Sequence, residues 1–202
     1  NKTIILVRHG ESNYNKSGII QGNTDVPYLT DRGFEQANFI GNWLNELTIN
    51  NFFSSPLTRA KQTAEIIAEN CKFDKSNIKF DTRLEEIDFG SWKGKQRSIV
   101  RKEFPQEYKT WRRRPFDLII DGKFPVQDLY NRIESFVNTE ILSDKNNGTC
   151  IIVGHRGTIS SIINCLLKLP KSHHHFLQID RGSITVLQER LSEYKSIDFE
   201  LT

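Results

Sequence analysis

Two short apolar runs, residues 3–7 and 149–153, each lead directly into a histidine with a glycine beside it. Runs of this length and composition, bounded by glycine, indicate buried strands. An α/β sheet binds its ligands at the carboxyl ends of such strands. The pattern therefore predicts an α/β fold with His9 and His155 at this edge, although it does not show that the two strands are neighbours. Gly10 is expected to let the backbone turn sharply and approach a ligand closely.

Helix and strand patterns alternate along the rest of the chain. Apolar residues recur at helical spacing in residues 31–47, in the segment that Arg59 opens, and in residues 126–142 and 159–169. Short strand patterns cover residues 51–54, 78–80 and 183–188, and a loosely alternating edge strand is expected at 194–201. This alternation predicts a three-layer α/β fold, with a mainly parallel sheet and helices on both faces.

Five ordered sequence blocks extend over nearly the whole chain. The first runs from Leu6 to Ser12, with Asn15 three residues later. The others are residues 20–22 with 25 and 29–33, residues 54–60, residues 84–87 with 89, 90 and 94, and residues 153–155. Together they resemble the histidine phosphatase superfamily, which includes cofactor-dependent phosphoglycerate mutases and many small phosphatases. A phosphoglycerate mutase-like fold is therefore expected.

The resemblance implies a phosphohistidine mechanism. His9 would be the nucleophile, because a neutral imidazole nitrogen attacks phosphorus without first losing a proton. Arg8 and Arg59 would hold the phosphate oxygens with planar, permanently charged guanidinium groups, and His155 would add another donor. Glu86 would protonate the leaving oxygen and then take a proton from the attacking water.

The acid is the least certain of these assignments, because Glu85 and Glu86 are adjacent. In the family, the acid stands four residues before the glycine that is Gly90 here, which selects Glu86. Glu85 remains the alternative. Arg59 also has an alternative, a solvated surface position, although the first turn of a helix favours anions because its amide groups are free.

Other site residues follow from the same resemblance. They are expected to bind the substrate and comprise Ser12, Asn15, Gln21 and Gly22. One departure from the family comes after His155, where Arg156 and Gly157 stand in place of the two glycines of many relatives. Arg156 is therefore expected to narrow or charge the pocket.

A cap-like insertion is expected around residues 95–125, the least regular stretch of the chain. Arg112 and Arg113 follow Trp111 there, and they would hold a carboxylate or a second phosphate of the substrate. A solvated basic helix end is the alternative, because charge runs usually face water. In the family, this region tends to set the substrate. Its Trp-Arg-Arg run also resembles the substrate-binding arginines of phosphoglycerate mutases, so mutase activity stays an alternative.

Composition limits the remaining possibilities. A chain of 202 residues with 37% hydrophobic and 26% charged residues fits one domain over residues 1–202. The net charge of +3 is small and scattered, which argues against nucleic acid and suits a small anionic substrate. Without a long apolar stretch, signal sequence or lipidation motif, no membrane association and a cytoplasmic location are expected. A homodimer is left open.

No cofactor and no metal are expected. The run of residues 173–175 is all histidine, but it lacks carboxylate or cysteine companions at ligand spacing, and a loop is expected there. The three cysteines lie in apolar patterns and are expected to be free core thiols. Asn147 opens a glycosylation sequon, but Asn-Gly is above all a turn signal.

The sequence therefore predicts a metal-independent phosphomonoesterase for a small, carboxylated, phosphorylated metabolite. Phosphoserine, sugar-acid phosphates and ribazole phosphate all fit. A mutase is the second hypothesis, but the chain is shorter than typical mutases and lacks their proline-rich continuation after the arginine run. A third is a pseudoenzyme that binds a phosphorylated partner. The intact catalytic set argues against it, because binding needs no acid.

Overall fold

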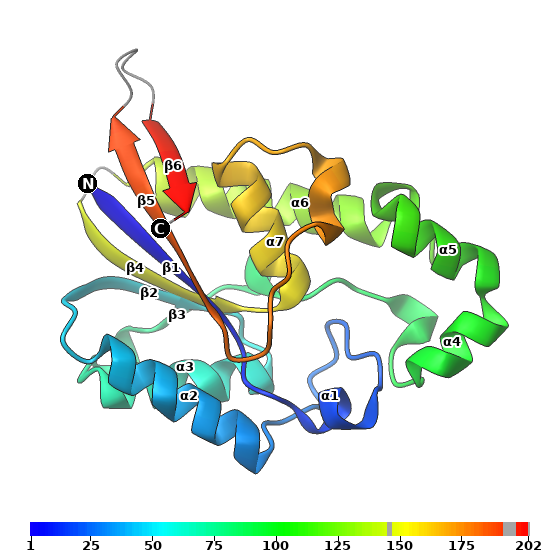
Figure 1. The fold of residues 1–202 in the computed structure, drawn as a ribbon, viewed down its shortest axis with the longest axis horizontal. Coiled ribbons are helices and arrows are strands. Elements are labelled where there is room, and N and C mark those ends of the chain that lie inside the picture. The colour runs from blue at the N-terminus through cyan, green and yellow to red at the C-terminus, as the bar shows by residue number, and fades with distance from the viewer. Residues whose placement is uncertain (145–146, 192–196, 202) are drawn as a thin grey trace.

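The computed structural model describes residues 1–144, 147–191 and 197–201, and its centre is a six-stranded sheet in the order β3-β2-β4-β1-β5-β6 (Figure 1). The strands are β1 Lys2–Arg8, β2 Ile49–Ser54, β3 Lys79–Phe80, β4 Gly148–Gly154, β5 Ile184–Leu191 and β6 Ile197–Leu201. Strands β1, β4, β2 and β3 are parallel to their neighbours in this group. Strand β5 runs antiparallel to β1 and to β6. The predicted mainly parallel sheet is confirmed.

Helices cover both faces of the sheet (Figure 1). Helices α2 Asp31–Leu44 and α3 Thr58–Asn70 pack on one face, and α6 Pro125–Phe136 and α7 Arg156–Leu166 pack on the other. Strand β1 is apolar on both sides because it lies between these layers: Ile4 and Leu6 join the α6–α7 cluster, and Ile5 and Val7 join the α2–α3 cluster. The predicted three-layer arrangement is therefore confirmed.

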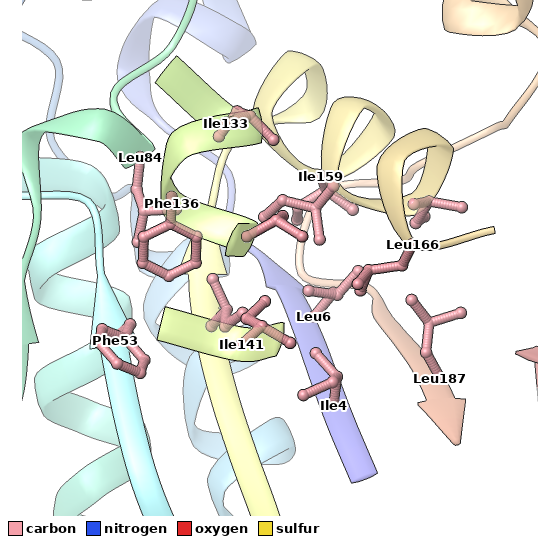
Figure 2. Close-up of a cluster of buried hydrophobic side chains, with 14 of the residues drawn as sticks. Ile4, Leu6, Phe53, Leu84, Ile133, Phe136, Ile141, Ile159, Leu166 and Leu187 are labelled. Carbon is pink, nitrogen blue, oxygen red and sulfur yellow. The ribbon is translucent and has the colours of Figure 1, made fainter. Parts of the chain in front are cut away.

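The larger apolar cluster lies between the sheet and α6–α7 (Figure 2). In it, Leu6 of β1 and Ile159 of α7 are fully buried, as is Phe136, whose ring meets that of Phe53 edge to face at 5.2 Å. Burying each such side chain stabilises the fold by about 1.5–3 kcal/mol. This packing fixes α7, whose first turn borders the site, against the central strands.

Some element boundaries differ from those predicted. Helix α2 ends at Leu44, so Leu47 lies beyond the helix and is 42% exposed. The predicted helix 126–142 becomes π-helical at η5 Val137–Leu142, a segment in which Val137 and Ile141 stay buried. Helix α7 begins at Arg156, directly after the strand, and ends at Leu166. The expected strand 194–201 is present as β6 over residues 197–201, and residues 194–196 lie outside the described residues.

The segment expected to be an insertion extends from one end of the sheet (Figure 1). It holds α4 Arg97–Glu103, α5 Pro105–Arg113 and the 3-10 turn η4 Pro115–Asp117. Its own small apolar cluster contains Trp92, Val100, Leu118 and Ile120. Shorter elements are α1 Asn13–Ser17, η1 Lys75–Asn77, η2 Thr82–Leu84, η3 Gly90–Trp92 and η6 Lys171–His175. None of the helices in the described ranges has the length and apolar character needed to cross a membrane.

Candidate active site

The candidate active site lies at the carboxyl ends of β1 and β4, two neighbouring parallel strands. Arg8 is opposite Gly154 in the ladder, and the N–H of His9 donates to the carbonyl of Gly154 at 3.0 Å. A histidine therefore follows each strand at the same edge. The rings of His9 and His155 meet edge to face with their centroids 5.2 Å apart.

A pocket of about 120 Å³ opens at this edge and gathers most of the residues expected from the sequence. Those that line it are Arg8, His9, Asn15, Gln21, Gly22, Arg59, Glu86, Arg112 and Arg156. His155 is fully buried beside His9 and is not in the lining. Ser12 and Arg113 also lie outside the lining.

The tautomer of His9 follows from its surroundings. Its Nδ1 atom lies 2.7 Å from the carbonyl oxygen of Gly10. A carbonyl oxygen only accepts, so Nδ1 carries the proton and the lone pair is on Nε2. Burial holds the pKa of His9 well below its usual range, and the charges of Arg59 and Arg8 act in the same direction. His9 is therefore a neutral imidazole with a free lone pair, which is the form a nucleophile requires.

Ser55 contacts the other histidine of the pair. The Ser55 hydroxyl oxygen accepts from the N–H of Leu57 at 3.3 Å and lies 2.8 Å from His155 Nε2. A hydroxyl has one hydrogen and two lone pairs, so Ser55 can either donate to Nε2 or accept from it, and the contact holds the ring without assigning its tautomer. Buried Nδ1 has no partner among the described residues. Burial, with nearby Arg59, holds the pKa of His155 well below its usual range.

Two buried arginines stand beside the histidines. Arg59, from the first turn of α3, donates to the carbonyls of Gly22 at 2.6 Å and Thr24 at 2.9 Å. Arg8, at the end of β1, donates to the carbonyl of Ile179 at 2.5 Å. Burial lowers the pKa of each guanidinium to about 10, so both remain charged at neutral pH. Within the described ranges, the Nε atoms of both arginines are buried and unpartnered, and such donors suit an oxyanion.

Glu86 is held by backbone amides. Its Oε1 accepts from the N–H of Ile87 at 3.0 Å, and its Oε2 accepts from the N–H of Gly157, in the first turn of α7, at 3.0 Å. A Cβ on Gly157 would lie 2.3 Å from Glu86 Oε1, so a larger residue there would displace the Glu86 carboxylate. The alternative acid, Glu85, does not line the pocket. The geometry favours Glu86.

The loop that follows His9 is organised by Ser12. The Ser12 hydroxyl donates to Gln21 Oε1 at 2.5 Å and accepts from the N–H of Asn15 at 3.1 Å, while Asn15 Oδ1 accepts from the N–H of Ser12. Ser12 is fully buried. It was expected to bind the substrate, but its bonds are used to hold the pocket residues Asn15 and Gln21.

Gly10 packs against protein rather than a ligand, which corrects the expectation from the sequence. A Cβ on Gly10 would lie 2.4 Å from the carbonyl oxygen of Gly33, and one on Gly33 would lie 2.2 Å from that of Glu11. Gly10 does not line the pocket. The two glycines let the loop after β1 lie directly on the first turn of α2, which fixes the backbone next to His9.

The arginine run in α5 is divided by the helical rotation. Tyr108, Trp111 and Arg112 line the pocket and share one face of the helix, because they are separated by three and four residues. Arg113 is rotated about 100° further and faces away. The expectation that Arg113 contacts the substrate is therefore corrected.

Arg97 also lines the pocket and was missed by the sequence analysis. It begins α4, in a stretch with no family block and no clear periodicity, so only the packed fold brings it to the site. Burial lowers the pKa of Arg156, as do the neighbouring charges of Arg112 and Arg97, while Glu86 opposes the change. No ion pair joins Arg97, Arg112 or Arg156 to a carboxylate in the part of the chain that the structure describes.

The histidine run forms the short helix η6 and supplies part of the pocket wall, where a loop was expected. His174 Nδ1 lies 3.2 Å from the hydroxyl of Tyr130, which accepts from Asn164 at 2.7 Å. His175 Nε2 lies 2.7 Å from the carbonyl oxygen of Trp111 and therefore donates to it. Both histidines line the pocket. No group of three or more potential metal ligands occurs among the residues whose structure is described.

Comparisons with known proteins agree with this geometry. The family model of the histidine phosphatase superfamily (branch 1) matches residues 4–198. The chain belongs to the histidine phosphatase superfamily. Relatives named as phosphatases support an enzyme of the phosphatase kind that hydrolyses phosphomonoesters, as predicted.

Among curated relatives, a probable 2-carboxy-D-arabinitol-1-phosphatase from Arabidopsis thaliana is 32% identical over 92% of this chain. This chain spans only 38% of that plant protein. A probable phosphoglycerate mutase, GpmB, from Salmonella choleraesuis is also 32% identical, over 95% of this chain and 86% of its own length.

Solved structures share the fold. A mycobacterial glucosyl-3-phosphoglycerate phosphatase, in complex with VO3, superposes with a TM-score of 0.87 at 26% identity, covering 100% of this chain and 98% of the other. The α-ribazole phosphatase of Shigella flexneri has a TM-score of 0.84 at 23% identity, over 98% and 95% of the two chains. This second likeness concerns the fold alone. The expected phosphoglycerate mutase-like α/β fold is confirmed.

Proposed function

We propose that this chain hydrolyses a small carboxylated phosphomonoester through a phosphohistidine intermediate on Nε2 of His9. The observation that carries the proposal is the state of His9, a neutral buried imidazole whose lone pair is on Nε2. Three buried nitrogens without a partner among the described residues are close to it in the fold, the Nε donors of Arg8 and Arg59 and Nδ1 of His155. Donors fixed before the reaction stabilise the negative charge of a phosphoryl group in transfer.

The reaction has two balanced steps. In the first, the Nε2 lone pair of His9 forms a bond to phosphorus, the bond from phosphorus to the leaving oxygen breaks, and Glu86 gives that oxygen a proton. In the second, water attacks phosphorus, Glu86 takes the proton from the water, and the bond to His9 breaks. The arginines supply the positive charge that a metal ion supplies in other phosphatases, so no metal participates.

The leaving group contacts the other end of the pocket. Arg97, Arg112 and Arg156 line it there without carboxylate partners in the described ranges, and Trp111 contributes an aromatic surface. Cations of this kind bind a carboxylate with charge-assisted hydrogen bonds. Residues 95–125 thus form a cap over the pocket, within a single domain that comprises residues 1–202. The relatives named for carboxyarabinitol phosphate and glucosyl-3-phosphoglycerate suggest that sugar-acid phosphates are the first class to test.

Rapid acid-free quenching would test the intermediate. The wild-type enzyme mixed with ³²P-labelled substrate should yield a protein-bound phosphate that is stable to base and labile to acid, as expected of a phosphoramidate. Glu86→Gln should accumulate this species with p-nitrophenyl phosphate, because its leaving group needs little protonation while attack by water still needs a base. His9→Ala should yield none. A labelled His9→Ala protein, or an unlabelled wild type that still turns over, would refute the proposal.

A mutase is the second candidate, favoured by the relatives named as phosphoglycerate mutases. The two activities differ in their products. With 3-phosphoglycerate and a bisphosphorylated primer, a phosphatase releases inorganic phosphate and a mutase releases 2-phosphoglycerate. A screen of phosphoserine, sugar-acid phosphates and ribazole phosphate that scores both products would decide between them. Isomer formation faster than phosphate release would replace the phosphatase proposal with the mutase.

A further inference from the structure

A second cavity, which we call the outer groove, adjoins the catalytic pocket. It has a volume of about 720 Å³ and lies between the start of α2 and residues 175–181, the segment that leads into β5. The lining that the two spaces share consists of Arg8, Arg97, Arg156 and His175. The outer groove therefore meets the catalytic pocket at Arg8, which is proposed to hold the reacting phosphate, and extends from there to residues that do not line the pocket.

The outer groove is built by specific contacts. Gln36 of α2 donates to the carbonyl of Arg181 at 3.2 Å and accepts from the N–H of Glu11 at 2.8 Å. Gly182 has a φ of 60°, and a Cβ there would lie 2.7 Å from that of Gln36. These contacts hold residues 175–181 against α2, so the two walls keep a fixed separation.

Positive charge predominates along the outer groove. Its arginines are Arg8, Arg32, Arg97, Arg156 and Arg181, and its carboxylates are Glu11 and Asp180. Arg181 and Glu11 approach to 3.5 Å, whereas Arg32, Arg97 and Arg156 form no ion pair with another described residue. The like charges lie close enough to interact, because Arg156 and Arg181 both help to lower the pKa of Arg8, after burial. A bound anion would relieve this repulsion.

The volumes of the catalytic pocket and the outer groove also favour a ligand that occupies both. At about 120 Å³, the catalytic pocket is smaller than the roughly 300–1,000 Å³ of typical small-molecule sites. With the outer groove, the combined space reaches that range. A phosphoryl group held by His9 and Arg59 would leave little room for a long leaving group inside the pocket, so its far end would enter the outer groove.

We propose that the outer groove is a second anion subsite, where Arg32 and Arg181 bind a phosphate or carboxylate at the far end of an elongated leaving group. This inference rests on the proposed phosphatase function and extends it to a substrate class, phosphomonoesters with a second anionic group several bonds from the scissile phosphate. Arg97 and Arg156 lie between the two anions and screen their mutual repulsion.

A series of alkanediol phosphates would test this subsite. Each chain length, from two to eight carbons, is prepared with a terminal hydroxyl, carboxylate or phosphate. The readout is the ratio of kcat/KM for the anionic substrate to that for the hydroxyl substrate of equal length. In the wild type, this ratio should rise to about 10 at one of the longer lengths, and fall at high salt. The carboxylate and phosphate arms show which anion the subsite prefers.

Variants locate the effect. The Arg32→Gln/Arg181→Gln double variant should remove the rise of the ratio at the longer lengths and leave the ratio of the short substrates unchanged. Arg32→Gln alone, which breaks no ion pair, should lower the rise part of the way. Arg113→Gln is the matched control: it removes the same charge from an exposed arginine outside both cavities, so the ratio should keep its wild-type value. Circular dichroism would check that each variant is folded.

The outcomes separate this inference from the proposed function. Hydrolysis of the hydroxyl substrates with a ratio near one at every length would overturn the subsite and leave the phosphatase intact. Equal ratios in the wild type and the double variant would do the same. If no substrate is hydrolysed, calorimetry can measure the affinities of the matching alkyl phosphonates. The ratio is then the affinity with a terminal anion divided by the affinity without one. Equal affinities would overturn the subsite there too.

Discussion

The two ends of the catalytic pocket are built in different ways. At the phosphate end, His9 is 2% exposed and Arg59 and His155 are 0% exposed, and each has a hydrogen bond that fixes its orientation. At the leaving-group end, Arg112 is an exposed side chain on α5, a helix with no fully buried residue. The phosphate end is therefore organised before any substrate binds, whereas the leaving-group end depends on long side chains at the surface.

This difference suits the two tasks. A phosphoryl group is the same in every substrate, so rigid donors fixed by backbone carbonyls recognise it without loss of side-chain entropy on binding. The leaving group varies between substrates. Side chains on a surface helix can change during evolution without disturbing the sheet, and substitutions there should alter specificity while leaving the chemistry in place.

The largest effect should come from the phosphate end. His9→Ala should reduce kcat/KM roughly 10⁴-fold or more for every substrate, because groups that act as a unit fail together. The fold should survive, as judged by circular dichroism and thermal unfolding. A variant that retains a tenth of wild-type activity would show that His9 is not the nucleophile.

A smaller loss should follow when the orientation of His155 is disturbed. Ser55→Ala removes the hydroxyl that contacts His155 Nε2, so the imidazole loses the side-chain contact that holds its orientation. We expect kcat to fall about 10-fold, or about 1.4 kcal/mol, with little change in KM. Ser54→Ala is the control, because its buried hydroxyl donates to a backbone carbonyl and contacts neither histidine. An equal loss of kcat in both variants would show that Ser55 contributes only to packing.

At the leaving-group end, the effect should depend on the substrate. Arg112→Gln should lower kcat/KM for carboxylated substrates by about 5- to 10-fold, in the range of a charge-assisted hydrogen bond. Hydrolysis of p-nitrophenyl phosphate, which has no second anion, should change little. Arg113→Gln should leave both rates near the wild-type values. Equal losses on both substrates for Arg112→Gln would contradict the division of the pocket into two ends.

His174, at the leaving-group end, is buried like the histidines of the phosphate end. Burial lowers the pKa of His174 to about 3 in the folded protein. Below about pH 6.5, the unfolded chain therefore takes up a proton at this residue that the folded protein does not, and the free energy of unfolding falls. Its contribution to stability is complete above pH 6.5 and declines as the pH falls towards 3, by on the order of 1 kcal/mol per pH unit. Urea unfolding at pH 7 and pH 5 should show a smaller loss for His174→Gln than for the wild type. Parallel losses would place His174 in a solvated site.

The smallest expected effect is that of a chelator. In the proposed mechanism the arginines supply the positive charge at the phosphate end, so kcat/KM should stay within experimental error after dialysis against EDTA. Vanadate should inhibit in the same buffer. Loss of activity on chelation, with recovery on addition of a divalent ion, would overturn the assignment of Arg8 and Arg59 as the charge source.

The same division shows what the sequence could predict. The phosphate end was predictable because His9, Arg59 and His155 each lie in a short contiguous motif at the end of a strand or the start of a helix. Parallel strands place such positions at one edge whatever their separation along the chain. The layers were predictable for a similar reason, since periodic apolar residues determine which faces are buried.

The leaving-group end was less predictable. Arg97 and His174 reach the pocket only through the packing of the insertion and of η6 against the sheet, and no local pattern contains that information. Arg113 was grouped with Arg112 because the two are adjacent in the sequence, whereas in helix α5 only Arg112 lines the pocket. Ser12 and Gly10 lie within the recognised motif, yet they support the pocket instead of lining it. This role is visible only from the hydrogen bonds and close contacts of the folded chain.

The position of β1 between β4 and β5 affects how the protein is made. Strand β1, which ends at Arg8, is synthesised before both of its neighbours, because β4 begins at Gly148 and β5 at Ile184. At about 5–20 residues per second, β1 waits roughly 10 to 30 s on the ribosome for its first neighbour and then its second. During that interval, its apolar residues Ile4 to Val7 lack both partners and are exposed to aggregation or to chaperones. A chain released before β5 would contain His9, the proposed nucleophile, but not the complete site around it.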